Sequence, residues 1–408
     1  MTVLRNIGTL ATCRAQGTQA DIHCIPGAAL AWDGPTIRWV GPEHDLPPED
    51  RDDESWDAGG ALVVPGLVDC HTHLAFGGWR GEEFEQRIQG RSYQEIARSG
   101  GGIASTVART RELTEDALLE RASGFLRQMV QLGVTTIECK SGYGLDLETE
   151  LRLLRVYRTL AELGLARVVA TFLGAHVVPP EYREHRAAYL DLVVDRMIPA
   201  VAESGLARFC DAFVEDSAFS VAEARRVLLA GRAAGLRPKL HADQLSSGGG
   251  AELAAEVGAV SADHLECISE AGILAMREAG CVAVSLPLAA LYLPRAPMPA
   301  RTLLGLGVPV AVATDFNPGS APSFHLPLAM MLACTLQRMT PAEVLKGATL
   351  VAARALGLDQ RIGSLEPGKA ADFALIDAGS VNHWMYHFRP NACVRTVAAG
   401  REVWRSAS

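Results

Sequence analysis

Two histidines, His71 and His73, stand two residues apart at the end of a long apolar run that begins at Leu62. Residues two apart in a β-strand point to the same side, so this His-x-His pair can present two imidazole rings to one metal ion. The alternative is a pair on a partly exposed edge strand. The segment at residues 64–69 before the pair, with His241 and Asp315 at the ends of later runs, favours the metal site.

His71, His73, His241 and Asp315 together offer three imidazole nitrogens and one carboxylate oxygen. This ligand set suits zinc or ferrous iron and leaves room for a water molecule. A metal ion lowers the pKa of water bound to it, which makes hydrolysis possible near neutral pH. The four residues therefore predict a metal-dependent hydrolase.

Two more histidines, His176 and His264, end apolar runs of the same kind. His264 is either a hydrogen-bonded core residue or a group that binds the attacking water or the developing oxyanion. Its place beside the predicted metal favours the second interpretation. His176 precedes Pro179 and Pro180, which stiffen the loop that follows it.

Other polar residues follow the same runs, and their spacing alone leaves their roles open. Arg80 is either a surface charge or a substrate ligand, and Tyr143, in a glycine-rich loop, is either structural or functional. Residues 315–320 make a tight turn whose amides and hydroxyl are suited to a carboxylate. The glycine-rich residues 100–102 and 246–250 are either mobile lids or loops that begin helices.

A regular alternation of apolar runs and helical stretches must position these side chains. The helix after Thr114 places Leu118, Ala122, Phe125, Leu126 and Met129 on one face at a period of 3.6, and Leu153, Val156, Leu160 and Leu163 repeat this pattern on the next helix. Eight strand-helix units in a row predict a (β/α)8 TIM-like barrel, with its chemistry at the carboxyl ends of the strands. The eight runs are residues 62–73, 134–140, 167–176, 209–215, 238–243, 261–265, 281–287 and 309–315.

The two ends of the chain contain short apolar segments separated by turn residues, as in a β-meander. Neither end can bury enough apolar surface alone, so we expect the two to pair into one small β-sandwich domain. The predicted organisation is residues 1–60 and 361–408 in this composite β domain, and residues 61–360 in the barrel.

The composition and net charge of the chain argue against some classes of binding partner. The 408 residues carry a net charge of -9, with 49% hydrophobic residues, and no basic stripe is visible along the sequence. This balance argues against binding to nucleic acid or to an anionic membrane. The nine cysteines form no Cys-x-x-Cys pair, and the first residues lack a signal peptide, so we expect reduced thiols in a cytoplasmic protein.

Longer strings resemble the amidohydrolase superfamily and, within it, the imidazolonepropionase family, through nearly the whole chain. They are PGLVDCHTHLAFGGWRGEEFEQRIQGRSYQEIARSGGGIASTV, ECKSGYGLD, FLGAHVVPPEY, KLHADQLSSGGGAELAAEVGAVSADHLE and ATDFNPGSAPS. The resemblance implies hydrolysis of 4-imidazolone-5-propanoate to N-formimidoyl-L-glutamate in histidine degradation. It also implies metal ligation by His71, His73, His241 and Asp315, and substrate contacts from Arg80, Tyr143, His176, Gln244, Asn317, Gly319 and Ser320.

Gln244 departs from many relatives, in which glutamate is common at this position. A glutamine can orient a substrate through its amide but cannot carry a proton. This weakens any mechanism in which the position acts as a base, and it speaks against the related deaminases. We therefore expect Asp315 to be the base, His264 to stabilise the oxyanion, and Arg80 to bind the substrate's propionate.

We expect one metal ion in each subunit. Binuclear relatives hold a second ion through a modified lysine at the end of strand 4, but this chain has residues 212–215 there, without a lysine, and Lys140 lies on strand 2. The alternatives are another amidohydrolase, such as an aminohydrolase of a nitrogen heterocycle, and, remotely, a non-catalytic barrel scaffold. The resemblance also suggests a homodimer.

Overall fold

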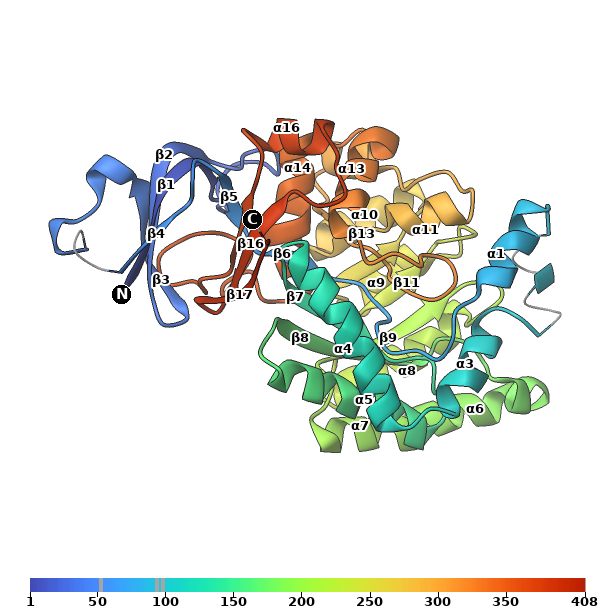
Figure 1. Cartoon of the computed structure of the whole chain (residues 1–408). Helices are drawn as coiled ribbons and strands as arrows, with labels where there is room; N and C mark the ends of the chain where they lie inside the picture. The colour runs from blue at the N-terminus through green and yellow to red at the C-terminus, as the bar shows by residue number, and fades with distance from the viewer. Residues whose placement is uncertain (51–53, 92–94, 97–99, 408) are drawn as a thin grey trace.

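The computed structural model describes residues 1–50, 54–91, 95–96 and 100–407. A parallel barrel forms the larger part of the molecule, and its eight strands follow one another in chain order (Figure 1). They are β6 Leu67–Asp69, β7 Val134–Lys140, β8 Arg167–Ala175, β9 Phe209–Val214, β11 Leu240–Ala242, β12 Ser261–His264, β13 Val282–Ser285 and β14 Val310–Val312. The short β10 Arg237–Pro238 pairs with β9 just before β11. The predicted barrel is confirmed.

Helices follow the strands and cover the outside of the barrel (Figure 1). Thr114 caps α4 by accepting a hydrogen bond from the Ala117 amide, and the predicted apolar face of α4 is buried at Leu118, Ala122, Leu126 and Met129. The longer helices are α1 Gly81–Ile88, α3 Ile103–Arg111, α4 Glu115–Gln131, α5 Leu147–Glu162, α8 Val221–Ala233, α10 Glu270–Ala279 and α13 Leu326–Gln337. The shorter ones are α6 Arg186–Leu192, α7 Ile198–Ser204, α9 Gly250–Glu256, α11 Pro287–Tyr292, α12 Ala300–Gly305, α14 Pro341–Lys346, α15 Ala352–Ala355 and α16 Val381–Tyr386.

The first and last strands of the barrel meet just beyond their ends. Thr72 and Phe316 form a parallel bridge, the Asp315 amide donates to the carbonyl of His71 at 3.0 Å, and the His73 amide donates to the carbonyl of Phe316 at 2.8 Å. The contact that closes the barrel therefore also sets Asp315 beside the two histidines of the His-x-His motif.

A second sheet contains strands from both ends of the chain. Its order is β17-β16-β15-β5-β1-β2-β3, and β4 pairs with β1. These strands are β1 Thr2–Ala11, β2 Cys24–Asp33, β3 Thr36–Pro42, β4 Glu54–Asp57, β5 Leu62–Pro65, β15 Phe373–Ile376, β16 Cys393–Ala398 and β17 Arg401–Arg405. Its apolar core is separate from that of the barrel and includes an edge-on contact between Trp32 and Phe373, with ring centroids 5.2 Å apart. The predicted pairing of the two ends is confirmed.

The apolar run at residues 62–73 is not one strand, and that expectation was wrong. Its first part, β5, pairs with β1 and β15 in the terminal sheet, and its second part, β6, pairs with β7 in the barrel. The chain crosses from one sheet to the other at Gly66, where a Cβ atom would lie 2.1 Å from Oγ1 of Thr135. Both halves are buried, which is why their sequence is uniformly apolar.

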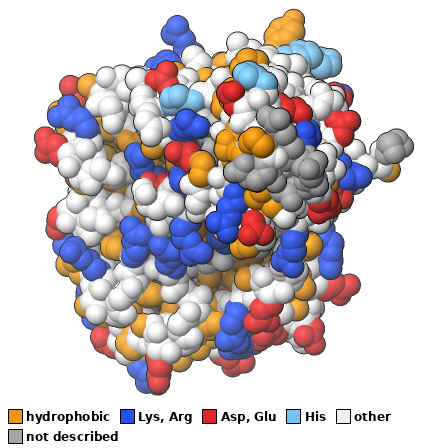
Figure 2. All heavy atoms as spheres, turned by 90° about the vertical axis from the view of Figure 1, so that its left-hand side faces the viewer, with side chains coloured by type: hydrophobic (Ala, Val, Ile, Leu, Met, Phe, Trp, Pro, Cys, Tyr) orange, Lys and Arg blue, Asp and Glu red, His pale blue; other side chains and the backbone are white. Residues whose placement is uncertain are grey.

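The surface at the end of the molecule that carries the terminal sheet is not uniformly acidic. Figure 2 shows Lys and Arg side chains gathered in a band across this face, although no basic stripe is visible along the sequence. All nine cysteines are free thiols. Within the described ranges, none of the helices has the length and apolar character needed to cross a membrane.

Candidate active site

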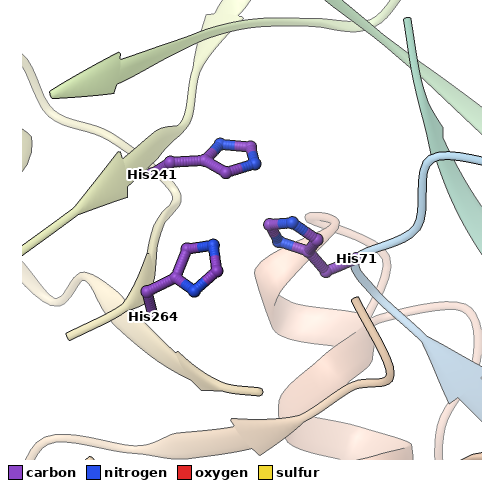
Figure 3. A group of neighbouring side chains, drawn as sticks. All are labelled: His71, His241 and His264. Atoms are coloured by element: carbon purple, nitrogen blue, oxygen red, sulfur yellow. The ribbon is translucent and has the colours of Figure 1, made fainter. Parts of the chain in front are cut away.

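The four predicted metal ligands come together at the carboxyl ends of the barrel strands. Nε2 of His71 lies 3.4 Å from Oδ1 of Asp315, and Nε2 of His73 lies 3.7 Å from the same oxygen. Nε2 of His241 lies 3.4 Å from Nε2 of His73. Figure 3 shows His71, His241 and His264 pointing toward one another from three separate segments of the barrel.

This group fits a divalent cation on its own chemistry. His71 Nε2 is buried and has no hydrogen-bond partner among the described residues, although the Asp315 carboxylate lies nearby. Burial lowers the pKa of His71, His73 and His241 well below the usual range, so their imidazoles are neutral and can donate lone pairs. Burial also raises the pKa of Asp315, a shift that a bound cation opposes.

A second layer of carboxylates orients the histidine rings. Nδ1 of His71 lies 2.6 Å from Oδ2 of Asp263, and Nδ1 of His241 lies 3.1 Å from Oδ2 of Asp211. A histidine that donates its Nδ1 hydrogen to a carboxylate keeps the lone pair on Nε2, which is the nitrogen that faces the centre of the group.

Two buried lysines hold these carboxylates in place. Nζ of Lys140 lies 2.8 Å from Asp211, 3.0 Å from Glu138 and 3.4 Å from Asp263, and Nζ of Lys239 lies 2.7 Å from Glu138. All five side chains have no exposed surface. Burial alone would lower the pKa of Lys140, but the three carboxylates outweigh it and raise the pKa well above its usual value.

Sequence reasoning missed this network. Glu138 and Lys140 stand two residues apart in a fully buried strand, so the alternation of side chains places both on the same side, inside the barrel. That was the available signal. Their partners are distant along the chain, such as Asp263 for Lys140 and Lys239 for Glu138, and the sequence does not reveal such pairings.

Two residues of the site, Asp315 and His264, adopt strained backbone conformations. The φ angles of Asp315 and His264 are 56° and 81°, in the left-handed region that favours glycine. Each such residue costs on the order of 1–3 kcal/mol and persists only where the surrounding structure enforces it. Both side chains are aimed into the same cavity, which they line.

Six of the seven predicted substrate contacts line that cavity beside the metal group: Arg80, Tyr143, His176, Gln244, Asn317 and Ser320. The seventh, Gly319, lies against Arg80, and a Cβ atom there would fall 1.4 Å from Nη2 of its guanidinium group. Nη1 of Arg80 lies 3.8 Å from Oε2 of Glu83. Ile103, Phe213 and Leu293 add apolar walls.

The loop that carries Tyr143 is fixed by a buried carboxylate. Glu150 accepts hydrogen bonds from the amides of Gly142, Gly144 and Leu145 at 2.8–3.1 Å. The carbonyl of Gly142 lies 2.9 Å from Nδ1 of His176, so the same loop also holds this histidine.

Carboxylates also hold the loop after β11, which carries Gln244. Glu215 accepts from the Leu245 amide at 2.8 Å, and Asp243 accepts from Gly248, Gly250 and Ala251 at 2.9–3.1 Å. Residues 246–250 therefore lead directly into α9. Similarly, Gly102 is the N-cap of α3, so residues 100–102 lead directly into that helix.

The turn after Asp315 uses its own polar groups. Oδ1 of Asn317 accepts hydrogen bonds from the amides of Gly319 and Ser320, both at 2.8 Å, and Nδ2 of Asn317 donates to the carbonyl of Asp315 at 2.7 Å. Two amides of the turn that the sequence suggested for a carboxylate, those of Gly319 and Ser320, are thus bonded to Asn317 in this structure.

Comparisons with known proteins agree with this architecture. The sequence profile described as Amidohydrolase family matches residues 62–403. A mutant atrazine chlorohydrolase from Arthrobacter aurescens TC1, complexed with zinc and atraton, has a similar structure, with a TM-score of 0.79, 17% identity and coverage of 98% of this chain and 95% of that chain. Guanine deaminase from E. coli gives a TM-score of 0.75 at 17% identity, with 100% of each chain covered. The chain belongs to the amidohydrolase family.

Relatives with higher sequence identity show where the chain belongs within the amidohydrolase family. Imidazolonepropionase from Cupriavidus necator is 50% identical over 93% of this chain and 91% of its own length. Imidazolonepropionase from Shewanella baltica is 47% identical over 94% of this chain and 95% of its own length, and that from Pseudomonas aeruginosa is 49% identical over 93% and 95%. Among the amidohydrolases, the chain belongs with the imidazolonepropionases.

Proposed function

We propose that this chain hydrolyses the ring amide of 4-imidazolone-5-propanoate to N-formimidoyl-L-glutamate, a step in histidine degradation. The observation that carries the proposal is the identity of 47–50% to imidazolonepropionases over more than nine-tenths of the chain. The buried group of three histidines and one aspartate, facing a cavity that Arg80 lines, supports it.

His71, His73, His241 and Asp315 would hold one divalent metal ion, zinc or iron. When bound, the ion supplies Lewis acidity and lowers the pKa of water in its coordination sphere. The described end of β9, from Ala212 to Glu215, has no lysine, and Lys140 is paired with buried carboxylates, which supports a single ion.

The side chains around this group provide the remaining chemistry. Asp315 accepts a proton from the attacking water, whose oxygen bonds to the ring carbonyl carbon. His264 donates a hydrogen bond to the developing oxyanion. The carbon–nitrogen bond then breaks, and Asp315 passes the proton to the departing nitrogen. Catalysis is thus assigned to Asp315 and His264.

Substrate binding is assigned to Arg80, Tyr143, His176, Gln244, Asn317, Gly319 and Ser320. The guanidinium group of Arg80 would bind the propionate, because it can grip a carboxylate with two hydrogen bonds. Arg80 is 6% exposed and lines the cavity, so the pair would be formed away from bulk water. Gly319 acts by leaving space for Arg80.

The test is the loss of imidazolone absorbance when purified enzyme of measured metal content is added to freshly made substrate. We expect rapid loss with formation of formimidoylglutamate, and no loss above the spontaneous rate with the His241→Ala variant. If the metal-loaded enzyme leaves the spontaneous rate unchanged, the substrate assignment fails while the amidohydrolase family stands. An assay for ammonia release from guanine and triazines tests the alternative aminohydrolase, and we expect none.

We further propose a cytoplasmic homodimer that binds neither nucleic acid nor membranes. The bacterial relatives support the cytoplasm, the net charge of -9 argues against nucleic acid and anionic membranes, and the homodimer follows from the family resemblance alone. Light scattering of the purified protein tests the dimer, which predicts a mass of twice 43.5 kDa. A monomer at micromolar concentration would contradict it.

A further inference from the structure

His264 and Glu266 form a buried pair beside the cavity. β12 ends at His264, and positive φ angles of 81° and 67° at His264 and Leu265 turn the chain sharply there. Nδ1 of His264 lies 3.9 Å from Oε2 of Glu266, and the two side chains are only 3% and 4% exposed. The backbone turn therefore brings two buried ionisable groups together.

Neither of these two atoms has a hydrogen-bond partner among the described residues. A buried polar atom without a partner is destabilising, and such atoms are rare in folded proteins. Each of the two atoms can supply the hydrogen-bond partner that the other lacks. A shift of about 1 Å would bring them within hydrogen-bond distance.

The opposite edge of the His264 ring faces the metal group. Its ring centroid lies 5.6 Å from that of His71 and 5.4 Å from that of His241. Figure 3 shows one ring nitrogen of His264 directed toward His71 and the other directed away. Because Nδ1 is the buried nitrogen beside Glu266, Nε2 is the one that faces the cavity.

We propose that Glu266 is a positioning residue for the hydrolysis, whose carboxyl group donates its hydrogen to Nδ1 of His264 and so places the ring hydrogen on Nε2. This inference rests on the proposed function, in which His264 stabilises an oxyanion. A neutral imidazole donates from one nitrogen and accepts at the other, so a donor at Nδ1 fixes the donor at Nε2. An oxyanion needs that donor.

The electrostatic surroundings support a protonated Glu266. Burial, with a smaller contribution from the carboxylate of Asp315, outweighs the opposing effects of a backbone hydrogen bond and of Arg295 and raises the pKa of Glu266 to about 8. Near neutral pH the carboxyl group of Glu266 therefore keeps its hydrogen and can donate it to Nδ1 of His264, 3.9 Å away.

Kinetics of two substitutions test the assignment. Glu266→Gln keeps a donor for Nδ1, so we expect its kcat to stay within about fivefold of the unsubstituted enzyme. Glu266→Leu removes the donor, and we expect kcat to fall by about 100-fold with little change in KM. Glu252→Gln and Glu252→Leu are matched controls, because Glu252 also has a buried carboxylate oxygen without a partner among the described residues but is not among the residues that line the cavity.

The pH dependence gives a second readout. Ionised Glu266 accepts instead of donating, so Nε2 loses its hydrogen, and kcat should fall above pH about 8. Glu266→Gln should remove that fall. Equal losses in folded Glu266→Gln and Glu266→Leu, or full activity of Glu266→Leu, would overturn the assignment.

Nitrogen NMR of histidine-labelled protein tests the pair without any turnover. The signals of His264 are identified by their absence in His264→Asn, and we expect hydrogen on Nε2 in the unsubstituted protein and in Glu266→Gln. Hydrogen on Nδ1 would overturn the inference. If the enzyme does not hydrolyse imidazolonepropionate, the proposed function fails, but the NMR result still decides the role of Glu266.

Discussion

Gly319 brings the loop after β14 into direct contact with the guanidinium group of Arg80. At this position a methyl group would overlap Arg80, because the Cβ atom would lie 1.4 Å from Nη2. The position of Arg80 in the cavity therefore depends on the absence of a side chain at residue 319.

Gly319→Ala should displace Arg80 and raise KM for imidazolonepropionate by about 10- to 100-fold, the range expected when one charge-assisted contact is lost. Steady-state kinetics measures this. Gly81→Ala is the control, since a Cβ atom there meets no described atom within 4 Å. An unchanged KM in Gly319→Ala would contradict the assignment of Arg80 to propionate binding.

Asp263 acts on the metal group through His71, whose Nδ1 lies 2.6 Å from its carboxylate. Asp263→Ala should weaken metal binding by about 10- to 100-fold, because the ring loses the partner that fixes its tautomer. Asp263→Asn keeps an acceptor and should weaken it less. Competition with a chelator gives the affinities, and equal values for all three proteins would contradict this role.

At the scale of elements, the strands that carry the ligands were predictable because parallel barrel strands are buried on both faces and are therefore apolar in sequence. The grouping of His71, His73, His241, His264 and Asp315 follows from the strand ends alone. Two features could not be predicted from the sequence. The run through Gly66 shows no composition change where it leaves one sheet for the other, and the partners of Lys140 are distant in sequence.

The loop between β7 and α5 depends on Glu150, which accepts several backbone hydrogen bonds inside the protein. Glu150→Ala leaves these amides without an acceptor, and we expect the free energy of unfolding to fall by roughly 3 kcal/mol. Urea unfolding measures it. Glu148→Ala, at a side chain that is 83% exposed, should change stability little. Equal stability of the two variants would show that the loop does not need Glu150.

At the scale of the whole molecule, the terminal sheet and the barrel share one continuous segment. β5 lies in the terminal sheet and β6 in the barrel, with Gly66 between them, and Figure 1 shows the two parts side by side at this point. The Gly66 amide also donates to the carbonyl of Asp372 at 2.9 Å, which ties the C-terminal part of the chain to the same crossing.

Gly66→Ala would force a Cβ atom to within 2.1 Å of Thr135 Oγ1, so we expect a loss of about 1–3 kcal/mol in unfolding free energy. Thermal unfolding followed by circular dichroism measures the loss. Gly124→Ala, where nothing lies within 4 Å of the added atom, is the control and should not destabilise the helix. A Gly66→Ala protein as stable as the control would show that the chain around Gly66 can shift to accommodate the added methyl group.

The buried charges of the barrel have a consequence for the valence of the bound ion. Lys140 and Lys239 face Glu138, Asp211 and Asp263, so with all five side chains ionised this network carries one net negative charge, and the carboxylate form of Asp315 adds a second. Asp69, whose pKa burial raises to about 7, bonds Thr314 and is largely protonated below that pH.

An ion of charge two therefore balances the net charge of these six side chains, whereas a monovalent or trivalent ion leaves an uncompensated charge among them, in a medium where charge is costly. The fixed charges thus select for valence, and the nitrogen-rich ligands then favour transition metals over magnesium or calcium.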